Sequence, residues 1–305
     1  MVVSTFGARM VELWVPDKNG VLGNVVLGLP SPQHYADRAN LYLGCTVGRV
    51  AGRIPQAHFA GSGLSLSLEP NEGPNQLHGG GTRSFDRIEW ELVTFESDES
   101  VVAEFHYVSP AGEEEYPGEL TVVSRYELFA QGVLTCTLTA ETTSACPVNL
   151  TTHSYWNLSG KAGSTIHDHE LTADVAWHVE TGEGQLPTGE LTPTPHQLSL
   201  AAPGWDDTFI LEETDHTQTP AATLSHAGSG RTLTLYTTEP ALQIYTAGYL
   251  PEEAFDDVHV LTAFGGVCLE PQRINDNALL PQFPSIVVEP GETYTHVTTH
   301  VFSCL

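Results

Sequence analysis

Hydrophobic and polar residues alternate along most of the chain, with apolar residues at every second position. This alternation puts apolar side chains on one face of an extended strand and polar side chains on the other. No stretch of comparable length sustains the helical period of about 3.6 residues, so any helices should be short. The alternating segments are 64–68, 100–107, 119–129, 134–140, 233–235 and 242–244.

Clusters of turn residues separate the predicted strands, among them Pro70 to Asn75 and Gly228 to Gly230. With 28 glycines and 20 prolines, the succession of strands and turns predicts an all-β fold, a large antiparallel β-sandwich or barrel. No linker, fixed-period repeat or low-complexity tract interrupts the chain. Residues 1–305 are therefore expected to form a single domain, although an all-β chain of this length also has room for two sandwiches.

The composition favours a soluble, unsecreted, cytoplasmic protein. The chain has 305 residues, 40% of them hydrophobic, which is enough for a core without disulfides or metals. No segment approaches the roughly 20 apolar residues of a membrane span, and the N-terminus lacks a basic segment followed by an apolar one. The five cysteines are odd in number and contain no Cys-x-x-Cys pair, so we expect reduced, mostly buried thiols.

The balance of charge is strongly acidic, with 38 Asp and Glu against 11 Lys and Arg and a formal net charge of −27. Such a chain repels phosphate-rich partners at long range, which argues against nucleic acid and anionic membranes as partners. The excess commonly reflects solubility or adaptation to salt, and an acidic recognition patch is the less common alternative.

Polar residues that interrupt regular strands are candidates for chemistry, because their burial has a cost that packing alone does not offset. Glu270 follows the apolar residues Val267 to Leu269. Such surroundings raise the pKa of a carboxyl group towards neutrality, which would suit a base near pH 7. On position alone, a strand-end glutamate that faces water is the alternative.

Two histidines lie in similar polar segments. His153 lies between Asn149 and Tyr155, among amide and aromatic side chains that could hold one tautomer of the ring. His78 precedes three glycines, which would let a ligand approach the backbone. A structural histidine and a plain glycine turn are the respective alternatives.

Signals for other sites and reaction classes are weaker. Arg49 and Arg53 share one short segment of an arginine-poor chain and fit ligand contact or surface ion pairs equally well. The sequence has no Gly-x-Ser-x-Gly elbow, no phosphate-binding glycine loop before a helix and no His-Glu-x-x-His. His167, Asp168 and His169 are the closest trio of metal-ligand types, but they lie in a loop-like polar stretch, so no metal is expected.

Together these segments resemble the aldose 1-epimerase (galactose mutarotase) family, and the resemblance runs in order along nearly the whole chain. Each segment is a weak signal alone, whereas so many in one order are a strong signal. The matching segments are Phe6 to Ala8, Val15 to Gly20, Val26 to Gly28, Gly48 to Ile54, Asn75 to Gly80, Tyr116 to Gly118, Val148 to Leu158, Trp205 to Phe209, Leu242 to Thr246, Leu269 to Gln272, Phe283 to Ser285 and Pro290 to Glu292.

The resemblance implies a galactose mutarotase-like supersandwich, and an isomerase that interconverts the α and β anomers of free aldoses of the glucose and galactose type. It implies Glu270 as general base, His153 as general acid and His78 as a second histidine near the ring oxygen. Ring opening takes one proton from the C1 hydroxyl and delivers one to the ring oxygen, so no cofactor is needed. The expected partner is a monosaccharide, and the protein is expected to be a monomer or a homodimer. The residues that match contacts to sugar hydroxyls are Arg53, Asp206 and Gln243.

Among the departures of the chain from the family pattern, two directly precede matched site residues. Gly52 stands where asparagine commonly precedes the arginine matched to Arg53. Thr152 stands where asparagine commonly precedes the catalytic histidine. Because neither change affects the acid and base pair, the departures bear on substrate choice rather than on the reaction.

Three other functions fit the sequence less well than the family reaction. A hexose-6-phosphate epimerase of the same superfamily would need a cluster of Arg or Lys to hold phosphate, and this chain is short of both. A carbohydrate-binding protein without turnover would have no need to keep both Glu270 and His153. A glycosidase would need two carboxylates beside one bond, and Glu270 with Asp206 is the pair that could serve.

Overall fold

The computed structural model describes residues 1–201, 204–213, 216–275 and 283–304, and most of them lie in strands or in the turns between them. Every pairing between named strands is antiparallel, as the alternation and turns predicted. The one α-helix of the described residues, α1, has six residues. The expectation that helices are short is therefore confirmed. No helix of the described residues is long and apolar enough to span a membrane.

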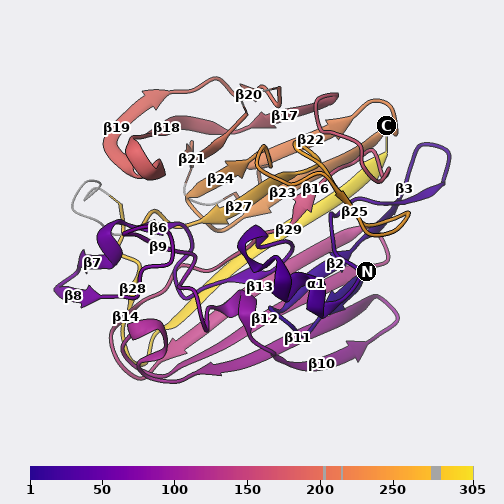
Figure 1. Ribbon diagram of the computed structural model, residues 1–305. Coiled ribbons are helices and arrows are strands. Elements are labelled where there is room, and N and C mark those ends of the chain that lie inside the picture. The colour runs from indigo at the N-terminus through magenta and orange to yellow at the C-terminus, as the bar shows by residue number, and fades with distance from the viewer. Residues whose placement is uncertain (202–203, 214–215, 276–282, 305) are drawn as a thin grey trace.

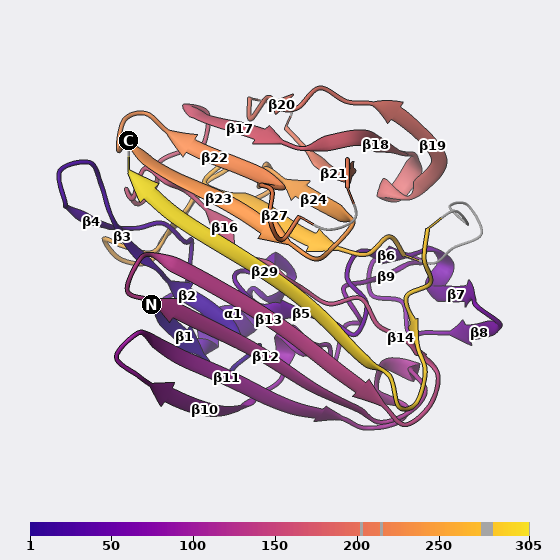
Figure 2. The ribbon, with the colours of Figure 1, turned by 180° about the vertical axis from the view of Figure 1, so that it is seen from behind.

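A nine-stranded sheet forms one layer of the molecule and contains the longest alternating segments. Leu134, Cys136, Leu138 and Ala140 all point inwards and are buried, as their spacing predicted. Figure 2 shows this sheet from its outer face. Its strands in order are β10 (Glu91–Glu96), β11 (Ser100–Ser109), β12 (Leu120–Phe129), β13 (Val133–Thr142), β29 (Thr293–Cys304), β23 (Arg231–Thr237), β22 (Ala222–His226), β17 (His169–Ala173) and β20 (Gln197–Leu198).

A six-stranded sheet packs against the inner face of the nine-stranded sheet (Figure 1). Leu233 and Leu235 of the larger sheet belong to the same buried cluster as Leu242 and Ile244 of the smaller one. Burial of these apolar faces against each other makes the structure a β-sandwich, as expected from the sequence. The strands of the smaller sheet in order are β16 (Tyr155–Trp156), β27 (Val267–Gln272), β24 (Ala241–Tyr245), β21 (Asp206–Leu211), β18 (Val175–Thr181) and β19 (Pro187–Pro193).

Short elements, most of them from the first third of the chain, cover the remaining inner face of the large sheet (Figure 1). The short strand pairs are β1 (Val2–Ser4) with β2 (Arg9–Glu12), β3 (Trp14–Pro16) with β4 (Leu22–Asn24), β5 (Thr46–Val47) with β15 (Thr151–Thr152), β6 (Arg53–Ile54) with β9 (Gln76–Leu77), β7 (His58–Gly61) with β8 (Leu64–Ser67), β14 (Cys146–Pro147) with β28 (Val287–Val288), and β25 (Glu253–Ala254) with β26 (Val260–Leu261). The helices are α1 (Pro32–Asp37) and the single-turn 3₁₀ segments Ala39–Leu41, Pro55–Ala57, Phe85–Arg87, Glu113–Glu115 and Glu183–Gln185.

Arg49 is one of the groups that hold these short elements in place. Its side chain is 2% exposed, and its guanidinium donates to the carbonyl oxygens of Ser109 and Pro110, both at 3.0 Å. A buried charge is tolerated when hydrogen bonds replace its water. The surface ion pair considered for Arg49 is therefore wrong, and the residue instead anchors the segment that leads into Arg53.

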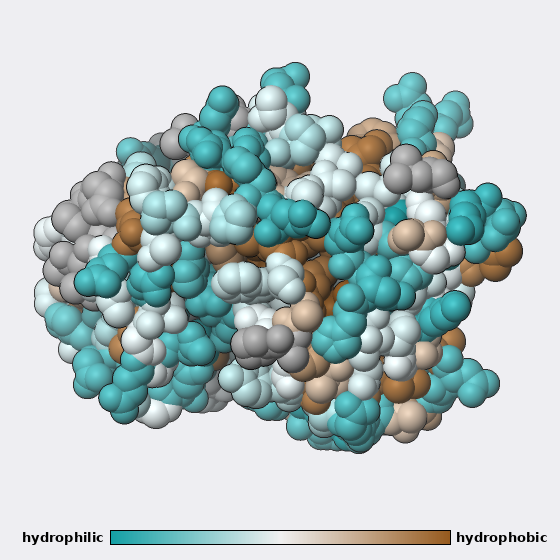
Figure 3. All heavy atoms as spheres, turned by 90° about the horizontal axis from the view of Figure 1, so that it is seen from above, coloured by the Kyte–Doolittle hydropathy of each residue, from teal (hydrophilic) through white to brown (hydrophobic). Residues whose placement is uncertain are grey.

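The surface and the thiols agree with the composition. Hydrophilic residues cover most of the face seen in Figure 3, and hydrophobic residues are scattered or recessed between them. All five cysteines are free, and four are buried whereas Cys304 is exposed. The expectation of unpaired, mostly buried thiols is confirmed.

Candidate active site

A cavity of about 460 Å³ is lined by residues of the short pair β6 and β9 and of the strands β24 and β27. Its volume lies within the range typical of small-molecule sites. All six site residues nominated from the sequence line this one cavity. They are Arg53, His78, His153, Asp206, Gln243 and Glu270.

Cross-strand pairing explains why residues so far apart in sequence meet. Gln243 of β24 lies directly opposite Glu270 of β27, and Thr208 of β21 lies opposite Gln243. Residues opposite each other on neighbouring strands point to the same face of the sheet. Cys268 shares this face of β27, because it lies two residues before Glu270, whereas Leu269 points into the core.

Glu270 is buried inside the cavity, with 1% of its surface exposed. Burial, with a smaller contribution from the nearby Asp206, raises the pKa of this carboxyl well above its usual value. Its Oε2 accepts no hydrogen bond from the part of the chain that the structure describes. The water-facing glutamate is therefore wrong, and the raised pKa expected from the apolar neighbours is confirmed.

His153 lies beside this carboxyl in the loop between β15 and β16. Its Nε2 is 3.5 Å from Glu270 Oε1, and its ring packs at 5.1 Å from the ring of Tyr155. Burial lowers the pKa of His153 to about 4, because the charged ring would lose its hydration. The structure thus places a proton donor and a proton acceptor next to each other.

His78 faces His153 across the cavity, with ring centroids 5.5 Å apart and planes at 88°. The backbone N–H of Gly52 donates to His78 Nδ1 at 3.1 Å. Because Nδ1 accepts, the neutral ring carries its hydrogen on Nε2. Burial and the nearby His153 lower the pKa of His78 well below its usual value, so the ring is a neutral hydrogen-bond donor.

A chain of polar contacts holds the remaining nominated residues. Arg53 donates from Nε and Nη2 to the two carboxylate oxygens of Glu72, at 2.7 and 2.9 Å, and its Nη2 lies 3.9 Å from Asp206 Oδ2. Gln243 donates to Asp206 Oδ1 at 3.0 Å and accepts from the Thr208 hydroxyl at 2.6 Å. Fixed side chains of this kind present hydrogen-bonding groups in one geometry, as a polyhydroxylated ligand requires.

Several residues of the cavity carry no signal in the sequence. Glu72, which orients Arg53, lies in the turn cluster from Pro70 to Asn75, and turn chemistry alone accounts for an acidic residue there. Tyr249 lines the cavity and is 81% exposed, so its ring lies at the opening. No periodicity or motif marks an exposed tyrosine in a loop.

The second guanidinium of the cavity is also paired. Arg273 Nε lies 3.8 Å from Glu239 Oε2, and the guanidinium packs 4.6 Å above the ring of Tyr294. Since both arginines that line the cavity are matched by carboxylates, a phosphate group would have to compete with them. This arrangement disfavours the hexose-6-phosphate alternative.

The two departures from the family pattern differ in position. Gly52 lines the cavity, and a side chain added there would approach Asn275 Nδ2 at 3.4 Å. Thr152 pairs with Thr46 and is not among the lining residues of the described chain. Only Gly52 therefore changes the surface that a ligand would touch directly.

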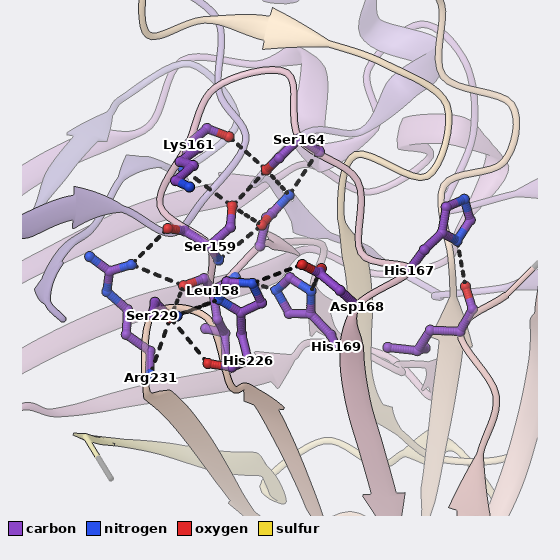
Figure 4. A network of polar contacts seen from close by, with 12 residues as sticks. Leu158, Ser159, Lys161, Ser164, His167, Asp168, His169, His226, Ser229 and Arg231 are labelled. Atoms are coloured by element: carbon purple, nitrogen blue, oxygen red, sulfur yellow. Dashed lines mark hydrogen bonds and ion pairs between the residues drawn. The ribbon is translucent and has the colours of Figure 1, made fainter. Parts of the chain in front are cut away.

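A second polar cluster lies outside the cavity and includes part of the trio considered as metal ligands (Figure 4). His169 Nδ1 and His226 Nε2 lie 3.1 and 3.0 Å from the Asp168 carboxylate. The other nitrogen of each ring accepts a backbone N–H, from Leu158 at 2.9 Å and from Ser229 at 3.0 Å. The nitrogens that face Asp168 therefore carry hydrogens, which blocks the lone pairs that a metal would need.

Neither His167 nor the group of His153, Cys268 and Glu270 is better suited to bind a metal than this cluster. His167 points away from the cluster, with its Nδ1 3.2 Å from the carbonyl oxygen of Leu200 (Figure 4). His153 and Glu270 line the cavity, and Cys268 lies close enough to both for the three to share an ion. Burial, however, raises the pKa of the Cys268 thiol well above its usual value, so the sulfur keeps its hydrogen.

Comparison with known proteins agrees with the geometry of the cavity. The family model described as Aldose 1-epimerase matches residues 1–300. A galactose mutarotase from Sus scrofa is 36% identical over 99% of this chain and 90% of its own length. The solved structure of an aldose epimerase homologue from C. elegans has a TM-score of 0.88 at 25% identity, over 99% of this chain and 95% of that one. A galactose 1-epimerase structure from Lactobacillus acidophilus has a TM-score of 0.84 at 25% identity, over 99% and 90% of the two chains.

We predict that Zn²⁺ does not stabilise the cluster of Asp168, His169 and His226, because its hydrogen bonds use both nitrogens of each ring. Binding to the native state would raise the midpoint of thermal unfolding. The measurement compares melting curves after dialysis against EDTA, with and without equimolar Zn²⁺. A zinc-dependent rise that disappears in Asp168→Asn would show that the cluster is a metal site.

Proposed function

The chain belongs to the aldose 1-epimerase family, and from this premise we propose which of its residues carry out the family reaction. The protein is an isomerase that interconverts the α and β anomers of an aldose. We assign Glu270 as the general base that acts on the C1 hydroxyl and His153 as the general acid that acts on the ring oxygen. The substrates we propose are free hexoses of the galactose and glucose type, in line with the galactose mutarotases that the chain resembles.

One observation carries this assignment, the buried contact between Glu270 Oε1 and His153 Nε2 at 3.5 Å. Burial disfavours the charged form of each group, so in the free protein a single proton rests on the carboxyl and faces the imidazole. The C1 hydroxyl and the ring oxygen of a pyranose are bonded to the same carbon. Two neighbouring groups can therefore serve both oxygens at once.

In our proposal, sugar binding triggers a proton transfer between Glu270 and His153. The shared proton moves from Glu270 to His153 Nε2, which leaves a carboxylate beside an imidazolium. Glu270 Oε2, which accepts no hydrogen bond from the described residues, then takes the proton of the C1 hydroxyl. His153 gives its proton to the ring oxygen, the bond from C1 to the ring oxygen breaks, and C1 becomes an aldehyde.

Rotation about the C1–C2 bond presents the other face of the aldehyde, and ring closure uses the same two groups in reversed roles. His153 takes the proton of the attacking hydroxyl and Glu270 returns one to the new C1 hydroxyl. Protons balance without a covalent intermediate. Each positioned acid or base contributes roughly 10² to 10⁴ in rate, which suits a reaction that already proceeds in water.

The remaining groups of the cavity hold the sugar. His78 offers its Nε2–H near the ring oxygen, and Arg53, Asp206 and Gln243 offer donors and acceptors to the other hydroxyls. Because Glu72 and Thr208 fix Arg53 and Gln243, these groups need little reordering when a sugar binds. We propose that they set affinity, while Glu270 and His153 set the rate.

We also propose that the chain is a single domain that acts in the cytoplasm as a monomer or a homodimer. β29, near the end of the chain, lies between β13 and β23 in the large sheet, and this interleaving supports one folding unit. The four buried free thiols are compatible with a reducing compartment.

We predict that Glu270→Gln separates turnover from binding. The change removes the basic carboxylate but keeps nearly the same volume, so mutarotation should fall by roughly 10² or more. Sugar affinity should stay within a few-fold, because the other contacts remain. Polarimetry of freshly dissolved α-glucose and α-galactose measures turnover, and calorimetry on the same preparation measures binding.

Glu113→Gln is the matched control for this prediction, because Glu113 is a buried glutamate that does not line the cavity. It should leave turnover unchanged. Normal turnover in Glu270→Gln would mean that another group takes the C1 proton. A native protein that binds sugar without accelerating mutarotation would contradict the proposed function itself.

We predict a bell-shaped dependence of kcat/KM on pH, because the active pair holds one proton. Below about pH 4, the lowered pKa of His153, a second proton would occupy the pair and stop turnover. The alkaline fall should come above the usual carboxyl range, since the pKa of Glu270 is raised. Rates are measured by polarimetry with the buffer reaction subtracted. An acidic limb centred on the ordinary histidine value, about 6.5, would contradict the one-proton pair.

A further inference from the structure

We propose that Cys268 is a positioning residue that fixes the tautomer of His153, so that Nε2 remains the nitrogen that takes and gives the proton. This inference rests on the proposed role of His153 as the acid. Cys268 Sγ lies 3.4 Å from His153 Nδ1, whereas Nε2 of the same ring faces Glu270. Each nitrogen of the imidazole thus has its own neighbour.

A backbone carbonyl sets the direction of the hydrogen bonds behind the ring. The carbonyl oxygen of Leu41 has no hydrogen to give, so the Tyr155 hydroxyl, 2.7 Å away, donates to it. Cys268 lies directly opposite Tyr155 in the pairing of β16 with β27, and the lone pairs of the Tyr155 oxygen are free to accept the hydrogen of its thiol. With its hydrogen directed at Tyr155, the sulfur presents lone pairs to His153 Nδ1, which therefore donates.

Two further features support this direction. Burial keeps the thiol protonated by raising the pKa of Cys268, so the sulfur retains a hydrogen for Tyr155. The carbonyl oxygen of His153 itself, which accepts from Gly44 N–H at 2.9 Å, also favours a hydrogen on the ring. The sulfur of Cys268, as the neighbour of Nδ1, favours the placing of that hydrogen on Nδ1.

His78 provides the opposite case in the same cavity. Its Nδ1 accepts the Gly52 N–H, so its hydrogen lies on Nε2 and it can only donate to the sugar. For His153 the arrangement is reversed, because Nδ1 holds the hydrogen and Nε2 has a free lone pair. The two facing histidines therefore hold opposite tautomers, one suited to binding and the other to proton exchange.

The tautomer matters for the proposed reaction. When Nδ1 keeps its hydrogen throughout, the ring alternates between neutral and charged by gaining and losing a proton at Nε2 alone. In the other tautomer, Nε2 would already carry a hydrogen and could not accept the proton that Glu270 releases. Loss of the Cys268 contact should therefore lower the rate of the chemical step rather than the affinity for sugar.

The test is the tautomer of His153, read from ¹⁵N chemical shifts of histidine-labelled protein near pH 7, with the signals assigned through His153→Asn and His78→Asn. We expect His153 to carry its hydrogen on Nδ1 and His78 on Nε2. Two variants should each populate the other tautomer of His153. Cys268→Val removes the thiol but fills its space, and Tyr155→Phe frees the thiol hydrogen to turn towards the ring. Cys268→Ser keeps a group that both accepts and donates, so it should preserve the native tautomer.

Kinetics on the same variants give a second readout. Cys268→Val should lower kcat about tenfold, which corresponds to the loss of one buried hydrogen bond, and should change KM little. Cys268→Ser should restore most of the lost kcat. Cys136→Val is the matched control, because this buried thiol lies in β13, whereas Cys268 contacts His153. It should change neither the tautomer nor kcat. If Cys268→Val fails to fold, Cys268→Ala takes its place.

The outcomes separate this inference from the proposed function. A hydrogen on Nε2 of neutral His153 in the native protein, or an unchanged tautomer in Cys268→Val, would overturn the positioning role of Cys268. A shifted tautomer with unchanged kcat would support that role and would contradict the assignment of His153 as the acid.

Discussion

The burial of one carboxyl group beside one imidazole is the constraint on which the rest of the cavity depends. Glu270 and His153 both lose hydration, and burial shifts their pKa values in opposite directions, so a single proton suits the pair. Neither group would be acceptable in a core without a partner. A sugar whose C1 hydroxyl and ring oxygen stand on one carbon is the kind of ligand that can use both. The polar groups around the pair, such as Arg53 and Gln243, are themselves held by hydrogen bonds.

The fold produces this constraint through sheet register and through anchored loops. Glu270, Gln243 and Cys268 share a face because strands alternate their side chains and neighbouring strands pair in register. His153 and His78 come from loops, which have no such register, so other contacts hold them. The backbone of Gly52 fixes His78, and buried Arg49 anchors the segment that contains Gly52. The strands of the sandwich and the loops thus hold the polar site together, and hydrogen bonds within the protein keep the loops in place.

The sequence predicted the β-sandwich and nominated residues of the cavity, but it could not predict the contacts that these residues make. Alternation identifies strands because the period of burial is a local property, and the buried faces of β12 and β13 agree with it. The sequence did not decide whether Glu270 is buried, because an apolar run such as Val267 to Leu269 can be followed by a buried or by a water-facing glutamate. Glu72 looked like a turn residue and Cys268 like a core thiol, because their importance arises from partners that lie far away in sequence. His226 joins Asp168 and His169 only through strand pairing, so its place in that cluster was likewise invisible.

The most direct test of the central claim, that Glu270 and His153 act as one proton-sharing unit, is a double-mutant cycle on kcat/KM. The measurement compares Glu270→Gln, His153→Asn and the double variant with the native protein by polarimetry, after subtraction of the uncatalysed rate. Residues that act as a unit give strongly non-additive effects. For one proton-sharing unit, we expect the double variant to be about as slow as the slower single variant. Losses that multiply would show that the two groups act independently, and would contradict the central claim.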